Sequence, residues 1–183
     1  MSCKLKSIAV YCGHQMGTDP QFKRDAAAVG RMLAKNGIRM VFGGGDVGLM
    51  GTVATAALKN GGEVIGVSTR DVIAMQEPAH DEIEVQVVNG VNERKQIMFE
   101  ESDAFIILPG GIGTLNELSD ILTMQQIGET EKPLFFLNTN GFWNPLTRLM
   151  KHMKKNGFIV KTDNYNIFSA DTVAELKKQI LKY

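Results

Sequence analysis

The sequence has little cysteine: Cys3 and Cys12 are the two thiols among its 183 residues. They form no CxxC pair and no histidine cluster lies beside them, which argues against a zinc site and excludes a disulfide scaffold. Hydrophobic residues make up 44% of the chain and charged residues 22%, close to globular averages, so intrinsic disorder is excluded too. We therefore expect one globular domain over residues 1–183 that needs no metal.

The chain also lacks an excess of charge of either sign, because Lys plus Arg number 20 and Asp plus Glu also number 20. A formally neutral chain has no general attraction to nucleic acid or anionic lipid, and no basic stripe with interleaved aromatic residues is evident. No apolar run approaches the ~20 residues of a membrane span, and no apolar signal region follows the first methionine. We expect a cytoplasmic protein that binds neither nucleic acid nor a membrane.

What the sequence does have is a regular alternation of short apolar runs with helix-like segments. Several runs, such as residues 104–108, are continuously apolar, as expected of strands covered on both faces in a parallel sheet. The expected strands are 5–11, 38–42, 63–67, 84–88, 104–108, 133–137 and 166–168, and the expected helices are 19–36, 46–60, 91–102, 114–127, 142–156 and 171–182. This alternation predicts an α/β protein with a Rossmann-like, doubly wound, mostly parallel sheet of about seven strands and helices on both faces.

Three glycine-rich segments follow expected strands, at the edge where a doubly wound sheet binds its ligands. They are residues 12–17, 43–48 and 109–114. Glycine has no Cβ, so a ligand can come close to the backbone, and free amide groups at the start of a helix favour an anion. Three such loops at one edge indicate a site for a nucleotide or a sugar phosphate.

The second loop, residues 43–48, matches the dinucleotide-binding pattern GxGxxG. That fingerprint also requires an acidic residue about 20 positions further on, at the end of the next strand. Glu63 has this spacing but begins its expected strand, and Ser68 and Thr69 occupy the strand's other end. NAD binding is therefore disfavoured, and the absence of GxxxxGK[ST] disfavours a P-loop. The glycines can alternatively serve only to let the helix expected at 46–60 pack tightly on the sheet.

The third loop continues into Thr114 and Glu117, which admit two interpretations. T-x-x-E is a capping box, in which Thr114 caps the amide of Glu117 and the glutamate reaches back to the Thr114 amide. Capping requires none of Gly110, Gly111 and Gly113, and these glycines favour a functional carboxylate in the first turn of the helix, beside a phosphate. Spacing alone leaves the two interpretations equally supported.

A second charged segment opens the helix expected at 91–102. Arg94, Ile97 and Met98 share a face of this helix, so the guanidinium of Arg94 is expected to point partly inward. Lys95 is displaced by roughly 100° around the helix and is expected to have a different role. From the residues alone, Arg94 can instead be a structural ion-pair partner and Lys95 a solvated charge.

Residues 109–117, together with Glu93, Arg94, Lys95 and Met98, resemble the PGGxGTxxE and ERKxxM signatures of the LOG (Lonely Guy) family. The similarity extends through residues 10–13, 42–51, 62–67, 126–128 and 132–133. It covers most of the chain, and two long signatures in order make it specific. Members are often labelled lysine decarboxylases, but nothing in this sequence identifies a lysine that would carry pyridoxal phosphate, so we reject that label.

The resemblance implies a nucleoside 5′-monophosphate phosphoribohydrolase, which splits AMP or a cytokinin riboside 5′-monophosphate into free base and ribose 5-phosphate. By motif, Arg94 and Glu117 are the catalytic pair, and Glu117 is expected to be ionised at neutral pH beside the arginine. The substrate contacts implied are Gly44, Gly45, Lys95, Gly110, Gly111, Ile112, Gly113, Thr114 and Thr123. The resemblance further implies a homodimer that pairs through helices near the site, without a cofactor.

The sequence also departs from the family. His14 and Gln15 stand where Ser-Ser is frequent, and Met124 replaces the usual tryptophan. These changes affect expected contacts to the base or ribose, so adenine and N6-substituted adenine both stay open as the base. The alternative function is a non-catalytic nucleotide or molybdenum-cofactor carrier of the same fold, which would not need the carboxylate of Glu117.

Overall fold

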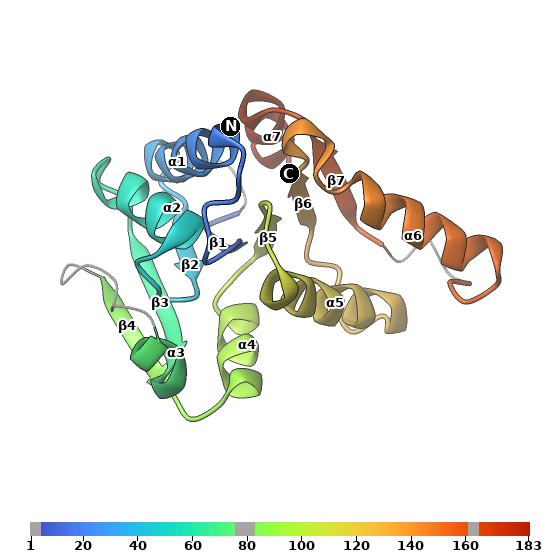
Figure 1. The fold of residues 1–183 in the computed structure, drawn as a ribbon, viewed down its shortest axis with the longest axis horizontal. Coiled ribbons are helices and arrows are strands. Elements are labelled where there is room, and N and C mark those ends of the chain that lie inside the picture. Colours follow the sequence, from blue (N-terminus) through green and yellow to red (C-terminus); the bar gives the residue numbers. More distant parts are fainter. Residues whose placement is uncertain (1–4, 76–82, 161–164) are drawn as a thin grey trace.

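A computed structural model describes residues 5–75, 83–160 and 165–183. Its centre is a seven-stranded sheet in the order β4-β3-β2-β1-β5-β6-β7, with every neighbouring pair parallel (Figure 1). The strands are β1 Ser7–Tyr11, β2 Arg39–Phe42, β3 Val64–Thr69, β4 Glu84–Val88, β5 Ala104–Ile107, β6 Leu134–Leu137 and β7 Ile167–Ala170. The predicted Rossmann-like α/β fold is confirmed.

The helices alternate with the strands along the chain. They are α1 Pro20–Lys35, α2 Gly48–Leu58, α3 Arg70–Met75, α4 Val91–Glu100, α5 Ile112–Ile127, the 3-10 turn η1 Thr139–Gly141, α6 Asn144–Lys155 and α7 Val173–Ile180. In the described part of the chain, no helix is both long enough and apolar enough to cross a bilayer. Local sequence explains where α1 begins. Asp19 is its N-cap and accepts a hydrogen bond from the Gln21 amide at 2.8 Å, and Pro20 occupies the first helical position, where proline is favourable.

The strand order reverses between β1 and β5, and this positions the site. The chain builds outward from β1 to β4 and then returns to place β5 on the other side of β1. The loops that follow β1 and β5 therefore diverge at the carboxyl edge, where doubly wound sheets bind ligands. They remain in contact, because the Gly13 amide donates to the Pro109 carbonyl at 3.0 Å.

Apolar side chains fill both faces of the sheet. One core contains residues of α1, α2 and α7, and the other contains residues of α4, α5 and the start of α6. Strands β1 and β5 are buried along their whole length, as their continuously apolar sequences predict. The two faces are covered unequally: α1 and α2 lie side by side, whereas α6 extends outward without a buried residue (Figure 1).

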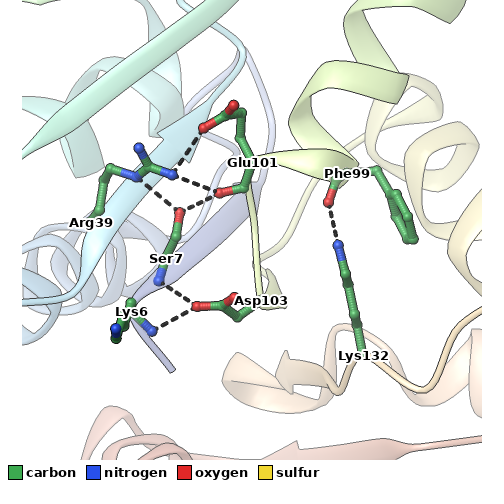
Figure 2. A network of polar contacts seen from close by, with 7 residues as sticks. All are labelled: Lys6, Ser7, Arg39, Phe99, Glu101, Asp103 and Lys132. Atoms are coloured by element: carbon green, nitrogen blue, oxygen red, sulfur yellow. Dashed lines mark hydrogen bonds and ion pairs between the residues drawn. The ribbon is translucent and has the colours of Figure 1, made fainter. Parts of the chain in front are cut away.

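Polar contacts join the opposite, amino edge of the sheet (Figure 2). The Asp103 carboxylate accepts hydrogen bonds from the amides of Lys6 and Ser7, at 2.7 and 3.0 Å. The Arg39 guanidinium pairs with Glu101, just after α4, at 2.9 Å. These bonds fix the end of α4 and the start of β5 against β1 and β2, so the first turn of α4 is held at the carboxyl edge.

Several helix boundaries differ from the prediction; α6 and α7, for example, each begin two residues later than expected. Helix α3 was not expected; it is one short helix of 6 residues, whose Val72 amide bonds to the Thr69 hydroxyl. Helix α2 begins at Gly48 rather than at residue 46. Helix α5 begins at Ile112 rather than at residue 114, because the preceding glycine turn leads directly into it. The last difference changes the interpretation of Glu117.

Candidate functional site

Arg94 and Glu117 meet at the carboxyl edge of the sheet. Arg94 lies in the first turn of α4, and its Nε donates to the Val67 carbonyl at 2.8 Å. Its Nη1 lies 3.4 Å from Oε1 of Glu117, and the two side chains are only 12% and 11% exposed. The inward direction predicted for Arg94 is therefore confirmed, and its partner is the predicted carboxylate.

The glycines after β2 make room for the guanidinium. A Cβ on Gly43 would collide with Nη2 of Arg94, so the arginine requires glycine there. Gly44 has φ +76°, a conformation that side chains other than glycine rarely adopt, and it packs against Ser68. Gly44 and Gly45 are both buried. The second loop thus has a role beyond tight helix packing: it holds Arg94 in place.

The capping-box interpretation of Thr114 and Glu117 is wrong. The N-cap of α5 is Gly111, with no side-chain cap bond, so Thr114 is the third residue of the helix. Thr114 is buried, and its hydroxyl packs where a Cβ on Gly110 would stand. Glu117 consequently lies in the second turn, too far along for the reciprocal bond of a capping box. The first three amides of α5, which have no partner within the helix, stay available to an anion.

The expectation that Glu117 is ionised at neutral pH needs correction, because its pKa lies near neutrality. Burial raises the pKa of this carboxyl to about 7, although Arg94 and Lys95 lower it; Asp120 raises it further. Desolvation therefore outweighs the favourable cations. A carboxyl of this kind exchanges its proton readily near neutral pH, which suits acid–base chemistry.

A cavity of 340 Å³ opens beside the carboxylate, between α4 and α5. It brings together three of the predicted site residues, Lys95, Glu117 and Thr123. The other residues that line it are Tyr11, Asn92, Gln96, Phe99, Asp120, Ile121 and Met124. The cavity thus combines polar side chains, such as those of Glu117 and Lys95, with apolar ones such as that of Ile121, a combination typical of a small-molecule site.

Lys95 is not the solvated charge that the sequence left possible. Its Nζ lies 2.6 Å from Oδ2 of Asp120 and donates to Oδ1 of Asn116 at 3.0 Å, and its side chain is 16% exposed. The two consecutive cations of α4 thus both reach α5, Arg94 to Glu117 and Lys95 to Asp120.

The remaining predicted contacts lie apart from this cavity. Gly110 and Gly111 line a second cavity of 160 Å³ that also contains His14 and Gln15. Its apolar lining consists of Met16, Phe22, Leu49, Pro109 and Phe142. Ile112 and Gly113 are exposed in the first turn of α5.

Several residues of the larger cavity were missed by the sequence prediction, and two of them, Tyr11 and Asp120, interact electrostatically with Glu117. Asp120 follows Glu117 by three positions, so the helical period could have placed both on one face of α5. Tyr11 ends β1 and stacks on Phe105 with centroids 5.9 Å apart. Burial, and then Glu117, raises the pKa of the Tyr11 hydroxyl well above its ordinary range, so that group keeps its proton. No sequence signal separated Tyr11 from the apolar strand residues.

The described part of the chain contains no group of three His, Cys, Asp or Glu residues placed to hold a metal ion. Cys12 is buried, and burial raises the pKa of its thiol far above its ordinary value. Cys3 lies outside the described residues. The cavity's one lysine, Lys95, is engaged by Asp120 and Asn116 rather than offered as a free amine, so the described lining does not suit pyridoxal phosphate.

The fold and the site define a class: a Rossmann-like α/β protein in which an Arg–Glu pair and glycine-rich loops meet at the carboxyl edge. A sequence model of the family described as "Possible lysine decarboxylase" matches residues 50–180. The chain belongs to this family, the LOG family.

Named relatives are similar over most of the chain. The cytokinin riboside 5′-monophosphate phosphoribohydrolase of Rhodococcoides fascians is 42% identical over 155 residues, which are 84% of this chain and 78% of the relative. The enzyme called LOG from Oryza sativa subsp. japonica, of the same activity name, is 37% identical over 180 residues, 98% of this chain and 74% of the relative.

Solved structures with this fold carry a different description. The molybdenum cofactor binding protein of Rippkaea orientalis has a TM-score of 0.70 at 23% identity, covering 98% of this chain and 97% of that one. The molybdenum cofactor carrier protein of Chlamydomonas reinhardtii has a TM-score of 0.71 at 22% identity, covering 97% and 98%. At these identities the similarity establishes the shared fold alone.

Proposed function

We propose that this protein is a nucleoside 5′-monophosphate phosphoribohydrolase that releases the free base and ribose 5-phosphate from AMP or a cytokinin riboside 5′-monophosphate. The observation that carries the proposal is the buried Arg94–Glu117 pair, 3.4 Å apart, beside the glycine-rich loops. The names of the relatives at 37–42% identity support it. A carrier protein needs to hold phosphate, but it does not need a buried carboxylate with an elevated pKa at the same place.

The residue types fit the chemistry of the N-glycosidic bond. As the bond between C1′ and the base nitrogen breaks, its electron pair leaves with the base and the ribose gains oxocarbenium character. An ionised Glu117 stabilises that positive charge and takes a proton from the water whose oxygen bonds to C1′. The base nitrogen takes up a proton, so substrate plus water gives base plus ribose 5-phosphate. Arg94 orients the carboxylate and compensates charge near the departing base.

We place the 5′-phosphate at the start of α5, against Gly110–Gly111 and the free amides of Ile112, Gly113 and Thr114. Both the helix dipole and the unpaired amides favour an anion there. The dipole alone contributes roughly 0.3–2 kcal/mol, and the hydrogen bonds from the amides add to it. Lys95 and Thr123 then contact the substrate from the larger cavity, and Gly44 and Gly45 contact it from the loop that follows β2. No cofactor or metal takes part in this scheme.

We also propose that the protein is a cytoplasmic homodimer. The apolar side chains left exposed support the dimer, because many of them belong to α5, α6 and the segment after α6, on the thinly covered face of the sheet. They are Ile112, Leu115, Ile127, Leu149, Met153, Phe158 and Val160. Such a concentration of apolar residues on one face is typical of a protein–protein interface.

The proposal is tested by chromatography of AMP, GMP, CMP and isopentenyl-AMP reactions for free base. Wild type should release base from at least one nucleotide. Glu117→Ala should abolish release while nucleotide binding, measured by calorimetry, survives; Glu129→Ala, at an exposed position just after the end of α5, is the matched control. Binding of nucleotides without base release by wild type would favour a carrier instead, and an active Glu117→Ala protein would refute the assignment of Glu117.

A further inference from the structure

Lys95 has two carboxylates within the same cavity but pairs with only one of them. Glu117 and Asp120 both line the 340 Å³ cavity, and they lie three residues apart on α5, so they share a face of that helix. The Lys95 ammonium lies 2.6 Å from Asp120 and 3.0 Å from Oδ1 of Asn116. Within the described residues, the ion pair of Glu117 is with Arg94.

This division of partners matters because a lysine side chain is long and rotatable. An ammonium that turned from Asp120 to Glu117 would form a second ion pair with the carboxylate and favour its ionised form strongly. It would also occupy the carboxylate oxygens, which a water molecule must reach. Arg94 cannot move in this way, since its Nε is anchored on the Val67 carbonyl at 2.8 Å.

The titratable groups that interact electrostatically with Glu117 lie on or next to three elements. The phenol of Tyr11, at the end of β1, and the thiol of Cys12, which follows it, are both buried. Their elevated pKa values keep both groups neutral. Arg94 and Lys95 on α4 favour the ionised carboxylate, and Asp120 on α5 opposes it. Of these, the Lys95–Asp120 pair is the part that a single substitution can rearrange, because Asp120 is 45% exposed and substitutions at exposed positions usually change stability little.

We propose that Asp120 is a positioning residue, which holds the Lys95 ammonium away from Glu117 and so leaves the carboxylate paired with Arg94 alone and free to accept a proton in the cavity. The catalytic use of that proton acceptor rests on the proposed function. The arrangement of charges does not, so the two can be tested separately.

The test is a double-mutant cycle on the titration of Glu117 itself. Glutamate side chains are labelled with ¹³C at the carboxyl carbon, and the Glu117 resonance is identified by its loss in Glu117→Gln. Asp120→Asn should lower the pKa of Glu117 by about one pH unit, because the freed ammonium approaches it. In the Lys95→Met background the same substitution should have a much smaller effect. Asp120→Glu, which keeps the carboxylate, should restore the wild-type titration.

Equal shifts in the two backgrounds would mean that Asp120 acts only through its own charge, and would overturn the proposal, as would no shift at all. The enzymatic readout is independent of this one. If base release is observed, the acidic limb of kcat/KM should move to lower pH in Asp120→Asn and should not move in Lys95→Met/Asp120→Asn relative to Lys95→Met. If no nucleotide releases base, the proposed function fails while the titration still decides the role of Asp120.

Discussion

The Arg94 guanidinium approaches the Glu117 carboxylate to 3.4 Å, a distance longer than that of a tight charged hydrogen bond. The arginine is directed by the Val67 carbonyl and by the space above Gly43, so it cannot close fully on the carboxylate. Burial therefore prevails over the ion pair, and the pKa of Glu117 rises to about 7. The same geometry leaves one carboxylate able to hold or release a proton near neutral pH.

Activity should rise with pH through about 7, because the proposed reaction needs Glu117 ionised and burial raises its pKa to about 7. A plot of kcat/KM for AMP hydrolysis against pH should show an acidic limb with its midpoint near that value, since kcat/KM reports the free enzyme. An ordinary glutamate would place the limb near its usual pKa of 4.5, and a profile flat down to that pH would contradict the role assigned to Glu117.

The free energy of unfolding of wild type should fall as pH rises, when it is compared with that of a variant that cannot ionise at residue 117. The folded pKa of Glu117 is about 7 and its ordinary value is 4.5, so between these values the folded state binds more protons than the unfolded state. The free energy of unfolding of wild type should therefore fall against that of Glu117→Gln across this window and level off above it. Urea titrations of both proteins along the window measure the difference, and a constant difference would show that Glu117 ionises normally.

Gly43→Ala should disable the site without disturbing the fold elsewhere. The new Cβ would collide with Nη2 of Arg94, so the guanidinium must move away from Glu117. A displacement of about 1 Å lowers kcat/KM by on the order of 100-fold. Gly90→Ala is the matched control, because a Cβ there meets open space at the N-cap of the same helix. Equal activities of the two variants would show that the position of Arg94 does not affect the reaction.

Much of the fold could be predicted because apolar runs such as 104–108 carry both the length and the burial of a strand. The edge of the sheet that carries the candidate site could also be predicted, because glycine-rich loops directly follow several of the expected strands. Helix α3 could not be predicted, because its 6 residues show too few turns for a period to appear. The start of α5 was misplaced for a different reason: Thr114 and Glu117 satisfy the capping pattern, and only the geometry of Gly111 shows that the helix has already begun.

The sequence predicted the Arg94–Glu117 pair that the structure brings together, but not its charge state. Arg94 and Glu117 could be selected from motif and helical face, yet their desolvation depends on how α4, α5 and β1 pack, which no local pattern encodes. The partner of Lys95 is a similar case. Asp120 is separated from it by 25 positions, so their 2.6 Å contact arises only when α4 and α5 pack on the same face of the sheet.

The thinly covered face of the sheet provides the last prediction, which concerns assembly. Ile112 and Ile127 at the two ends of α5 are 82% and 62% exposed, an unusual exposure for isoleucine unless another surface covers them. Burying an unpaired carboxylate at an interface core is unfavourable by about 2 kcal/mol or more, roughly a 30-fold loss of affinity. Ile112→Asp/Ile127→Asp should therefore shift the proposed dimer to monomer in sedimentation equilibrium.

Leu181→Asp, next to α7 on the other face, should leave the assembly unchanged, since that side chain is also partly exposed but lies on the well-covered side of the sheet. If wild type sediments as a monomer, the dimer proposal is wrong. If the Leu181 variant dissociates as readily as the α5 variant, the proposal that the dimer pairs through α5 is wrong. A new charge next to α7 would then disrupt the dimer as strongly as one on α5.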